Sequence, residues 1–144
     1  MKSIFSERGL FKLIPKSVSP VIALGTAAQL RGWTSVCAGD IKVFVKRDIL
    51  VTTGIVPYVI DTEIDVELYN GLPVTTEFQT IADLLSWCGT VKMSPQIPWE
   101  VFAMLFEGDE PYSKEAELEE YLEARGLIDP YRKLREECKS FYDY

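Results

Sequence analysis

The chain has 144 residues, of which 47% are hydrophobic and 26% charged, and its formal net charge is −7. This composition excludes a disordered chain, and the length favours a single domain over residues 1–144 with a hydrophobic core of its own. The acidic balance argues against a general binder of nucleic-acid backbones, because such proteins neutralise phosphates with Lys and Arg.

The first elements of the chain are predicted to be a short strand and a helix. Gly9 to Ile14 is an apolar segment typical of an edge strand, closed by Pro15. A helix is expected from Pro20 to Arg31. Gly32 can end this helix in the left-handed conformation, which would return Trp33 to the core.

Strands are expected through the middle of the chain. Residues 41–47 alternate apolar and polar side chains and predict a half-buried strand. Residues 51–60 contain Gly and Pro and indicate a turn. Residues 61–69 are predicted to form an acidic strand, and Asn70-Gly71 is a strong signal for a tight turn into a further strand over residues 72–75.

The acidic strand carries carboxylates at every second position, so we expect them on one face about 7 Å apart while Ile64, Val66 and Leu68 pack inward. Three interpretations stay open: a solvated sheet face balanced by Lys42 and Lys46, a docking strip for a basic partner surface, or a divalent-metal site. The carboxylates are those of Asp61, Glu63, Asp65 and Glu67.

From Thr76 the period changes to that of a helix. Thr76 followed by Gln79 three residues later fits a capping box, in which each side chain reaches a backbone N–H of the first turn. Gly89 is a natural stop for this helix. The apolar face consists of Phe78, Ile81, Ala82, Leu85 and Cys88.

The last third is predicted to be helical. A short apolar helix is expected from Trp99 to Glu107, and Ser113 is expected to cap an acidic helix that runs to Arg125 and Gly126. Asp129-Pro130 suits the cap and first position of a final helix. A sheet-rich first half followed by helices defines the fold class α+β, with a small antiparallel or mixed sheet packed against helices.

Negative charge is concentrated between residues 107 and 123, where eight acids accompany one Lys. Tyrosines gather in the same third of the chain, and Tyr often carries binding energy at the centre of an interface. The alternative is that Tyr121 and Tyr131 lie at the edge of the core with hydrated hydroxyls. The residues expected to bind a partner are Glu110, Tyr112, Glu117, Glu119, Glu120 and Tyr121, together with Asp61, Glu63, Asp65 and Glu67.

The residues needed for most catalytic mechanisms are missing. The chain has no His, which removes Ser-His-Asp and Cys-His catalysis as well as His-bound metals. It also has no phosphate-binding Gly-rich motif. Cys37, Cys88 and Cys138 are expected to be small reduced buried residues, and Asp83 to satisfy nearby backbone or Ser/Thr groups. We therefore expect neither an enzyme nor a cofactor or metal site.

The chain is predicted to act in the cytoplasm. Its longest apolar stretch, Val18 to Leu24, contains Ser19 and Pro20 and is far shorter than the roughly 20 residues of a bilayer span. The first eight residues also lack the apolar run of a secretory signal.

Two motifs carry a resemblance to a known family. The segments are Thr26-Ala27-Ala28-Gln29-Leu30-Arg31-Gly32-Trp33 and, after a strand pair, Gly71 to Leu85, which contains the pattern V-T-x-x-x-x-T-I-x-D-L-L. The chain resembles the AbiEi-like antitoxins of type IV toxin–antitoxin (abortive infection) systems, which have a Ser/Thr-Ala-Ala/Leu helix that ends in Gly and a later helix opened by this pattern. The family's fold markers correspond here to Thr26, Gly32, Thr76, Thr80 and Asp83.

The resemblance implies an antitoxin that neutralises a nucleotidyltransferase-type toxin. Few residues precede the shared region, so we expect a chain like the family's C-terminal domain, without a complete N-terminal winged helix. Residues 4–15 could be the remnant of a wing strand. Spacing i, i+3 places Thr80 and Asp83 on neighbouring turns, where they can tie the start of the helix to the sheet.

Three functions are compatible with these observations. The first is an antitoxin-like, non-enzymatic protein of a bacterial or phage defence locus that binds a protein partner. The second is an anti-defence inhibitor that uses its acidic surface to block a nucleic-acid-binding groove. The third is a small DNA-binding regulator, whose basic face would contain Lys42, Lys46, Arg47, Arg132, Lys133 and Arg135.

Overall fold

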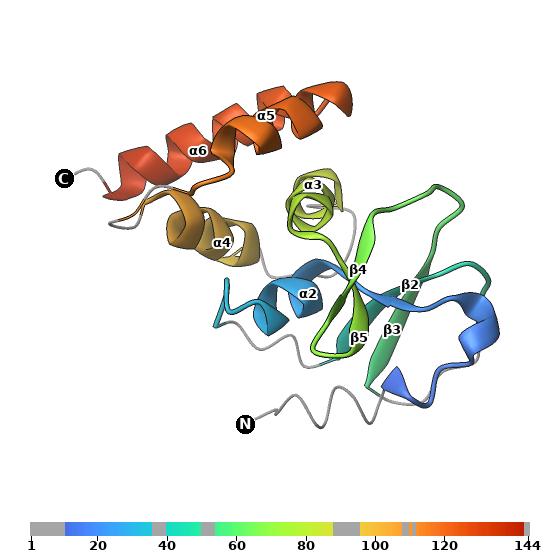
Figure 1. Ribbon diagram of the computed structural model, residues 1–144. Coiled ribbons are helices and arrows are strands. Elements are labelled where there is room, and N and C mark those ends of the chain that lie inside the picture. Colours follow the sequence, from blue (N-terminus) through green and yellow to red (C-terminus); the bar gives the residue numbers. More distant parts are fainter. Residues whose placement is uncertain are drawn as a thin grey trace.

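A computed structural model of the chain describes residues 11–35, 40–49, 54–87, 96–107, 110 and 112–142. It has the α+β architecture expected from the sequence, with a mixed sheet in the first half and helices after it (Figure 1). The described elements are η1 (Lys16–Val18), β1 (Val21–Ile22), α2 (Leu24–Leu30), β2 (Ile41–Val45), β3 (Ile55–Val59), β4 (Val66–Tyr69), β5 (Leu72–Thr75), α3 (Glu77–Trp87), α4 (Gln96–Phe106), α5 (Glu115–Ala124) and α6 (Ile128–Tyr142).

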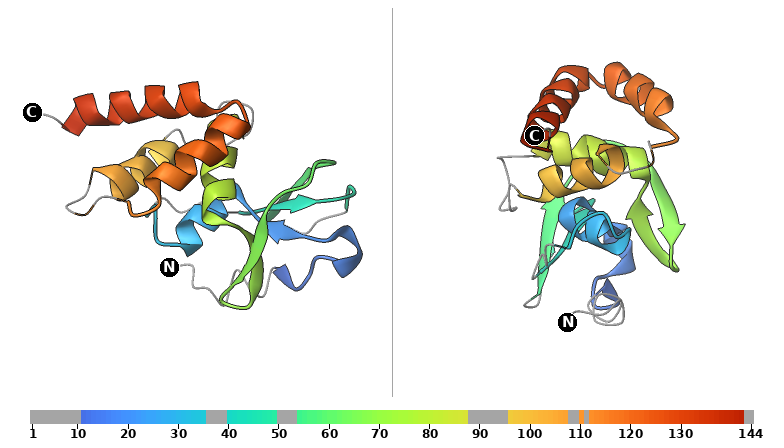
Figure 2. Two further views of the ribbon diagram at one scale, coloured as in Figure 1. Left: turned by 45° about the horizontal axis from the view of Figure 1, so that its top comes forward. Right: turned by 90° about the vertical axis from the view of Figure 1, so that its left-hand side faces the viewer.

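The sheet has the strand order β3-β2-β1-β5-β4. β1 is antiparallel to β2 and parallel to β5, β2 and β3 are parallel, and β4 and β5 form an antiparallel hairpin. Seen from the side, β3 and the β4–β5 hairpin lie on either side of α2, so the sheet curves around this helix (Figure 2). β3 and β4 are the two edges, and the six residues between them pass from one edge to the other.

The helices form two further layers above the sheet. α2 and α3 pack together next to the strands, α4 lies at the level of α3, and α5 and α6 form the layer farthest from the sheet (Figures 1 and 2). One core cluster joins α2 to β1, β2, β3 and β5, with Ala27, Val43 and Val74 fully buried. Another joins α3 to the last three helices through Leu84, Phe102 and other side chains. Burial of these apolar side chains supplies the main stabilisation of the fold.

The start of the chain differs from the expected strand and long helix. Residues 11–14 form a turn, in which the Ile14 amide donates to the Phe11 carbonyl at 3.0 Å, so the part of the expected edge strand that the structure describes is not a strand. The expected helix from Pro20 begins only at Leu24, because Val21 and Ile22 form the central strand β1. Val21 and Ile22 are β-branched and pack in the middle of the sheet, and the stabilisation from this packing outweighs their helix propensity.

The end of α2 is as expected. Gly32 has a φ of +78°, and the Trp33 amide donates to the Ala28 carbonyl at 3.0 Å, which is the closing hydrogen bond of a Schellman-type cap. Trp33 returns to the helical core. Thr26 also holds α2 to the sheet, since its hydroxyl accepts a hydrogen bond from the Lys42 amide at 2.9 Å.

The prediction of a turn over residues 51–60 is wrong for the second part of this range, because Ile55–Val59 forms the strand β3. Pro57 is tolerated there since β3 is an edge strand and needs no donor on its free side. The half-buried strand expected over 41–47 is also more buried than expected. All five residues of β2 are buried, including Lys42, because Phe44 on the second face is covered by Tyr58 and Trp87.

The acidic strand is shorter than expected and has the opposite orientation. Only Val66–Tyr69 is a strand, and Leu68 and Val66 are 77% and 42% exposed, so the expectation that they pack inward is wrong. Tyr69, two residues after Glu67, is the half-buried residue of β4 and packs against the core, while Glu67 stays exposed and lies 3.5 Å from the Arg31 guanidinium. The buried Arg31 side chain is compensated by Glu67 and by the Thr75 carbonyl, and this pairing is compatible with the observed orientation of β4.

The hairpin and α3 agree closely with the sequence. Asn70 and Gly71 have φ values of +52° and +80°, which identify a type I′ turn between β4 and β5. Thr76 caps α3 by accepting the Gln79 amide at 3.2 Å. The second half of the capping box is missing, because the Thr76 amide donates to the Asp65 carbonyl and the Gln79 side chain has other partners.

Thr80 ties α3 to the sheet as expected. Its hydroxyl lies 2.7 Å from the Thr75 hydroxyl and 2.7 Å from the Thr76 carbonyl oxygen, and the residue is fully buried. Asp83 does not take part in this tie. Its hydrogen-bond partner is the side chain of Gln79, one turn earlier on α3, and not the backbone or Ser/Thr groups that the sequence suggested.

The last helices exist where expected, with small differences at their starts. α4 begins three residues before Trp99 and takes Pro98 into its first turn. The expected Ser113 cap is wrong, since Lys114 is the residue before α5 and no side chain caps that helix. α6 begins at Ile128, so Asp129 lies in its first turn, where a negative charge favours the helix dipole.

Several expectations fall outside the described residues: those on residues 4–10 and on Cys37, Cys88 and Gly89. Within the described part, Cys138 is buried, as expected for a structural thiol. No helix in the described ranges combines the length and apolar character that a bilayer crossing requires.

Candidate partner-binding groove

A groove of about 490 Å³ lies between β4, the start of α3 and α5. It joins parts of both acidic regions that the sequence singled out, since Asp65 and Glu67 come from the first and Glu117 and Tyr121 from the second. Its floor includes the rings of Phe78 and Tyr121, whose centroids are 5.4 Å apart. The complete lining is Asp65, Val66, Glu67, Thr76, Glu77, Phe78, Lys114, Glu117 and Tyr121.

Tyr121 lines the groove and joins α5 to the segment before β4. Its hydroxyl donates to Asp65 Oδ2 at 2.6 Å and lies 3.0 Å from Gln79 Oε1. Arg125 completes this corner, with its guanidinium 3.3 Å from Asp65 Oδ2 and 3.4 Å from the centre of the Tyr121 ring. Partial burial and the bond to Asp65 both raise the pKa of Tyr121, so the phenol stays protonated and keeps donating.

A buried carboxylate lies behind this corner. Asp83 is only 6% exposed, and its Oδ1 accepts from Gln79 Nε2 at 2.8 Å while Oδ2 has no hydrogen-bond partner. Burial raises the pKa of Asp83 to about 7, against the smaller opposing effects of Gln79 and Arg125. Gln79 therefore connects the buried acid to the groove, because its Oε1 also accepts the Asp65 amide at 3.1 Å.

Glu77, at the start of α3, also lines the groove. Tyr112 donates its hydroxyl to Glu77 Oε1 at 2.8 Å, and Lys114 lies 3.1 Å from Oε2. Desolvation raises the pKa of Glu77, but the hydrogen bonds from Tyr112 and Lys114 outweigh it and leave the pKa below its usual value. Glu77 is therefore an anion over the neutral range.

Arg31 supports the groove from within the fold. Its guanidinium donates to the Thr75 carbonyl at 2.7 Å, stacks 4.9 Å from the Tyr69 ring centre and faces Glu67. Three groove carboxylates thus have a basic partner in the chain: Asp65, Glu67 and Glu77. Glu117 is exposed and forms no hydrogen bond or ion pair with any residue that the structure describes.

The structure brings together only part of the expected partner-binding set. Asp65, Glu67, Glu117 and Tyr121 line the groove, and Tyr112 orients Glu77, which also lines it. The remaining residues lie elsewhere. Glu63 lines a different cavity, Asp61, Glu110 and Glu120 are exposed outside the groove, and Glu119 is half-buried.

The expectation of four carboxylates on one face is therefore wrong, because only Glu67 of the four belongs to a strand. The metal interpretation also has no support: within the ranges described, no three His, Cys, Asp or Glu side chains converge as a metal site would require. Tyr121 does lie at the edge of the core, but its hydroxyl is bonded to Asp65 and Gln79. The edge position expected for Tyr131 is wrong, because this side chain is buried in the core and its hydroxyl accepts from Arg135 at 3.1 Å.

The basic residues suggested for a DNA-binding face do not form one surface. Lys42 is buried in β2, and Arg135 forms an ion pair with Glu115. Lys46 and Arg47 follow β2, whereas Arg132 and Lys133 lie on α6, in the layer farthest from the sheet (Figure 1).

Several groove residues were not identified from the sequence. Phe78, Glu77 and Lys114 line the groove, and Arg31 and Arg125 neutralise its acids. Helix periodicity placed Phe78 on the apolar face of α3, but no local signal predicts that its ring meets Tyr121. No known family model matches the chain, and no curated protein matches it, so the groove is interpreted from its own geometry.

Proposed function

We propose that this chain is a non-enzymatic, antitoxin-like protein of the cytoplasm, which binds a basic segment of a protein partner in the groove between β4 and α5. The observation that carries the proposal is the lining itself: four carboxylates and one ammonium surround the aromatic floor of Phe78 and Tyr121. Lys and Arg side chains suit such a surface, because the aliphatic stem packs on the rings while the charged end meets the carboxylates.

Preorganisation supports binding at this place. Arg125 and Lys114 fix Asp65 and Glu77, so a partner does not have to immobilise these side chains itself. Glu117 is left free to pair with an incoming cation. The Tyr121 side chain is held in place by Asp65 and Arg125, and it offers a partner both an apolar ring and a polar hydroxyl. Tyrosines of this kind often dominate the binding energy of an interface.

The resemblance to AbiEi-like antitoxins indicates the first partner to examine, a nucleotidyltransferase-type toxin encoded next to this gene. An antitoxin acts by occupying a surface of the toxin, so it needs shape and charge complementarity and no reaction centre. The unpaired carboxylate of Glu117, next to three carboxylates that have basic partners within the chain, supplies such complementarity toward the basic surface with which an enzyme of that type holds nucleotides or RNA.

A second function has one observation in its favour. Glu117, Glu120 and Glu123 of α5 are all exposed, and none has a partner within the described residues. Such a row of free carboxylates resembles the charge of a nucleic-acid strand. If no toxin gene lies beside the gene for this chain, these carboxylates favour a function as an inhibitor of a host nucleic-acid-binding protein.

Co-expression with the product of the neighbouring gene tests the leading proposal. We expect growth to be rescued and the two proteins to co-purify as a complex whose affinity falls with added salt. The variant Glu117→Lys should bind about tenfold more weakly, while Glu136→Lys, an equal charge change at an exposed site on α6, should bind like the parent. Absence of both rescue and complex, or equal losses in the two variants, would contradict the proposal.

A further inference from the structure

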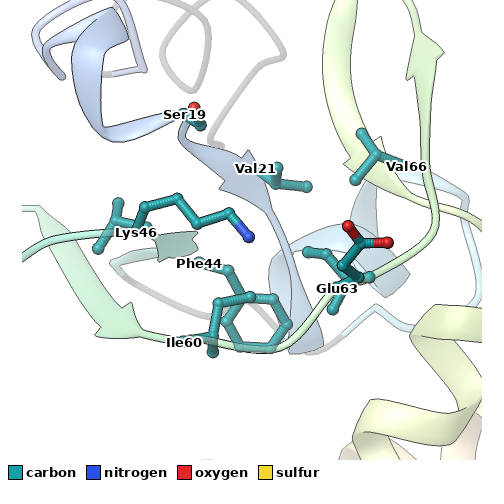
Figure 3. A pocket seen from close by; sticks show the side chains of 9 residues that line it. Ser19, Val21, Phe44, Lys46, Ile60, Glu63 and Val66 are labelled. Carbon is teal, nitrogen blue, oxygen red and sulfur yellow. The ribbon is translucent and has the colours of Figure 1, made fainter.

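A second cavity of about 350 Å³ lies on the other side of β4, over the centre of the sheet (Figure 3). The residues between β3 and β4 pass over this face of the sheet and enclose the space from one side. The lining consists of Ser19, Val21, Phe44, Val45, Lys46, Ile60, Glu63, Ile64 and Val66. All of these residues lie outside the groove described above except Val66, which is a wall of both.

The cavity has an apolar base. Val21 and Phe44 are paired neighbours on β1 and β2, and both side chains are buried. Ile60 and Ile64 come from the crossing segment and pack against the same cluster as Phe44. An apolar group that enters the cavity would therefore be removed from water on several sides, which is the main source of affinity for small ligands.

Two opposite charges line the cavity on either side of this apolar base. The Lys46 ammonium extends into the cavity from the end of β2, and the Glu63 carboxylate lies on its far side, pointing toward Val66 from the crossing segment (Figure 3). They do not form an ion pair with each other. The Lys46 ammonium has one long hydrogen bond, to the Thr62 carbonyl at 3.5 Å, and the Glu63 side chain has no partner among the described residues.

This arrangement selects for a ligand with both charges. A fatty acid would pair with Lys46 but leave Glu63 facing an apolar chain, and a polyamine would pair with Glu63 but meet the ammonium of Lys46. A zwitterion with a short apolar group can pair with both charged side chains and pack its apolar group on the apolar floor of the cavity. The volume is at the lower end of the ~300–1,000 Å³ typical of ligand pockets, which suits a molecule of this size.

We propose that the cavity binds a free α-amino acid with an apolar side chain. The carboxylate of the ligand pairs with Lys46, its ammonium pairs with Glu63, and its side chain rests on Phe44 and Ile60. This function is independent of the groove and of any protein partner. Ligand binding to the isolated chain is therefore sufficient to test it.

Titration of the purified chain with L-leucine, followed by two-dimensional NMR, tests the site. Saturable shifts at Val21, Phe44 and Ile64 are expected, with a Kd on the order of 1 mM or tighter. N-acetyl-L-leucine lacks the cation and L-leucinamide lacks the anion, so each should bind about tenfold more weakly. No saturable binding, or equal binding of leucine and both blocked compounds, would overturn the proposal.

Two variants assign the roles of the charged residues. Lys46→Met should weaken leucine binding about tenfold and remove the preference for leucine over leucinamide, whereas Glu63→Gln should remove the preference over N-acetyl-leucine. Both side chains are exposed, so the fold should be kept. Lys133→Met and Asp61→Asn, exposed positions outside the cavity, are the matched controls and should bind like the parent. Unchanged ligand preference in the first two variants would contradict the assignment.

Discussion

The hydroxyl of Tyr121 donates to the carboxylate of Asp65 at 2.6 Å and thereby joins α5 to the segment before β4. These residues are 56 positions apart in the chain. Their contact forms the corner of the groove, so the position of α5 relative to the sheet edge depends on it.

The Tyr121–Asp65 bond is expected to contribute modestly to stability, because the Asp65 side chain is half exposed and its interactions are screened by water. Tyr121→Phe should lower the free energy of unfolding by about 0.5–1 kcal/mol. Tyr58→Phe is the control, since the Tyr58 hydroxyl has no hydrogen bond within the described part of the chain, and it should change the value by less than about 0.5 kcal/mol. Urea unfolding measures both; equal effects would show that the bond contributes nothing.

The raised pKa of Asp83 makes stability depend on pH. In the unfolded chain this carboxyl ionises near pH 3.8, but in the fold it ionises only near 7. Stability from this group is therefore fully present below about pH 4, falls as the pH rises to about 7, and stays constant above that, with a total loss of at most about 4 kcal/mol. Glu77 has a lowered pKa and acts in the opposite direction near pH 4.

Asp83→Asn isolates this effect, because the amide does not titrate. The difference in unfolding free energy between variant and parent should shift in favour of the variant between pH 4 and pH 8, as measured by urea unfolding at each pH. The same comparison for Asp61→Asn, at an exposed position, should show no such trend. A constant difference for Asp83→Asn would mean that this carboxyl is not perturbed.

The Thr80 hydroxyl is expected to be worth more than a surface hydrogen bond, since it is fully buried and contacts both Thr75 and Thr76. Thr80→Val keeps the shape but leaves the Thr75 hydroxyl without its side-chain partner, so we expect a loss of about 1–3 kcal/mol in unfolding free energy. The matched change Thr62→Val, at an exposed position, should stay within about 0.5 kcal/mol. Thermal and urea unfolding that showed equal effects would argue against a structural role for Thr80.

The orientation of β4 gives a prediction opposite to that of its sequence pattern. Leu68 is 77% exposed, so Leu68→Lys should change the unfolding free energy by less than about 0.5 kcal/mol. If Leu68 packed inward, as the alternation suggests, the same change would cost several kcal/mol because a charge would be buried. Urea unfolding of this single variant distinguishes the two orientations.

Local signals predicted the elements whose structure is decided locally. Asn70-Gly71 specifies the tight turn through its left-handed backbone, and Thr76 identifies the start of α3. The sequence was misleading where distant residues decide. Pro57 indicates a turn until β3 is known to be an edge strand, and nothing local to Glu67 indicates that it pairs with the buried Arg31.

The groove was predictable only in its parts. Charge patterns identified both acidic regions, but nothing in the sequence places Glu117 and Tyr121 opposite Asp65 and Glu67, because that pairing depends on how α5 packs on α3. The same holds for Lys46 and Glu63, which line a cavity formed by the passage of the chain from one sheet edge to the other.

The most direct test of the account is an NMR titration of the purified chain with a synthetic Lys- and Arg-rich peptide at low salt. The groove predicts saturable shifts at Val66, Phe78, Glu117 and Tyr121, and about tenfold weaker binding for Glu117→Lys but not for Glu136→Lys. Shifts spread evenly over all acidic surfaces, without saturation and without a difference between the two variants, would contradict a specific basic-segment site between β4 and α5.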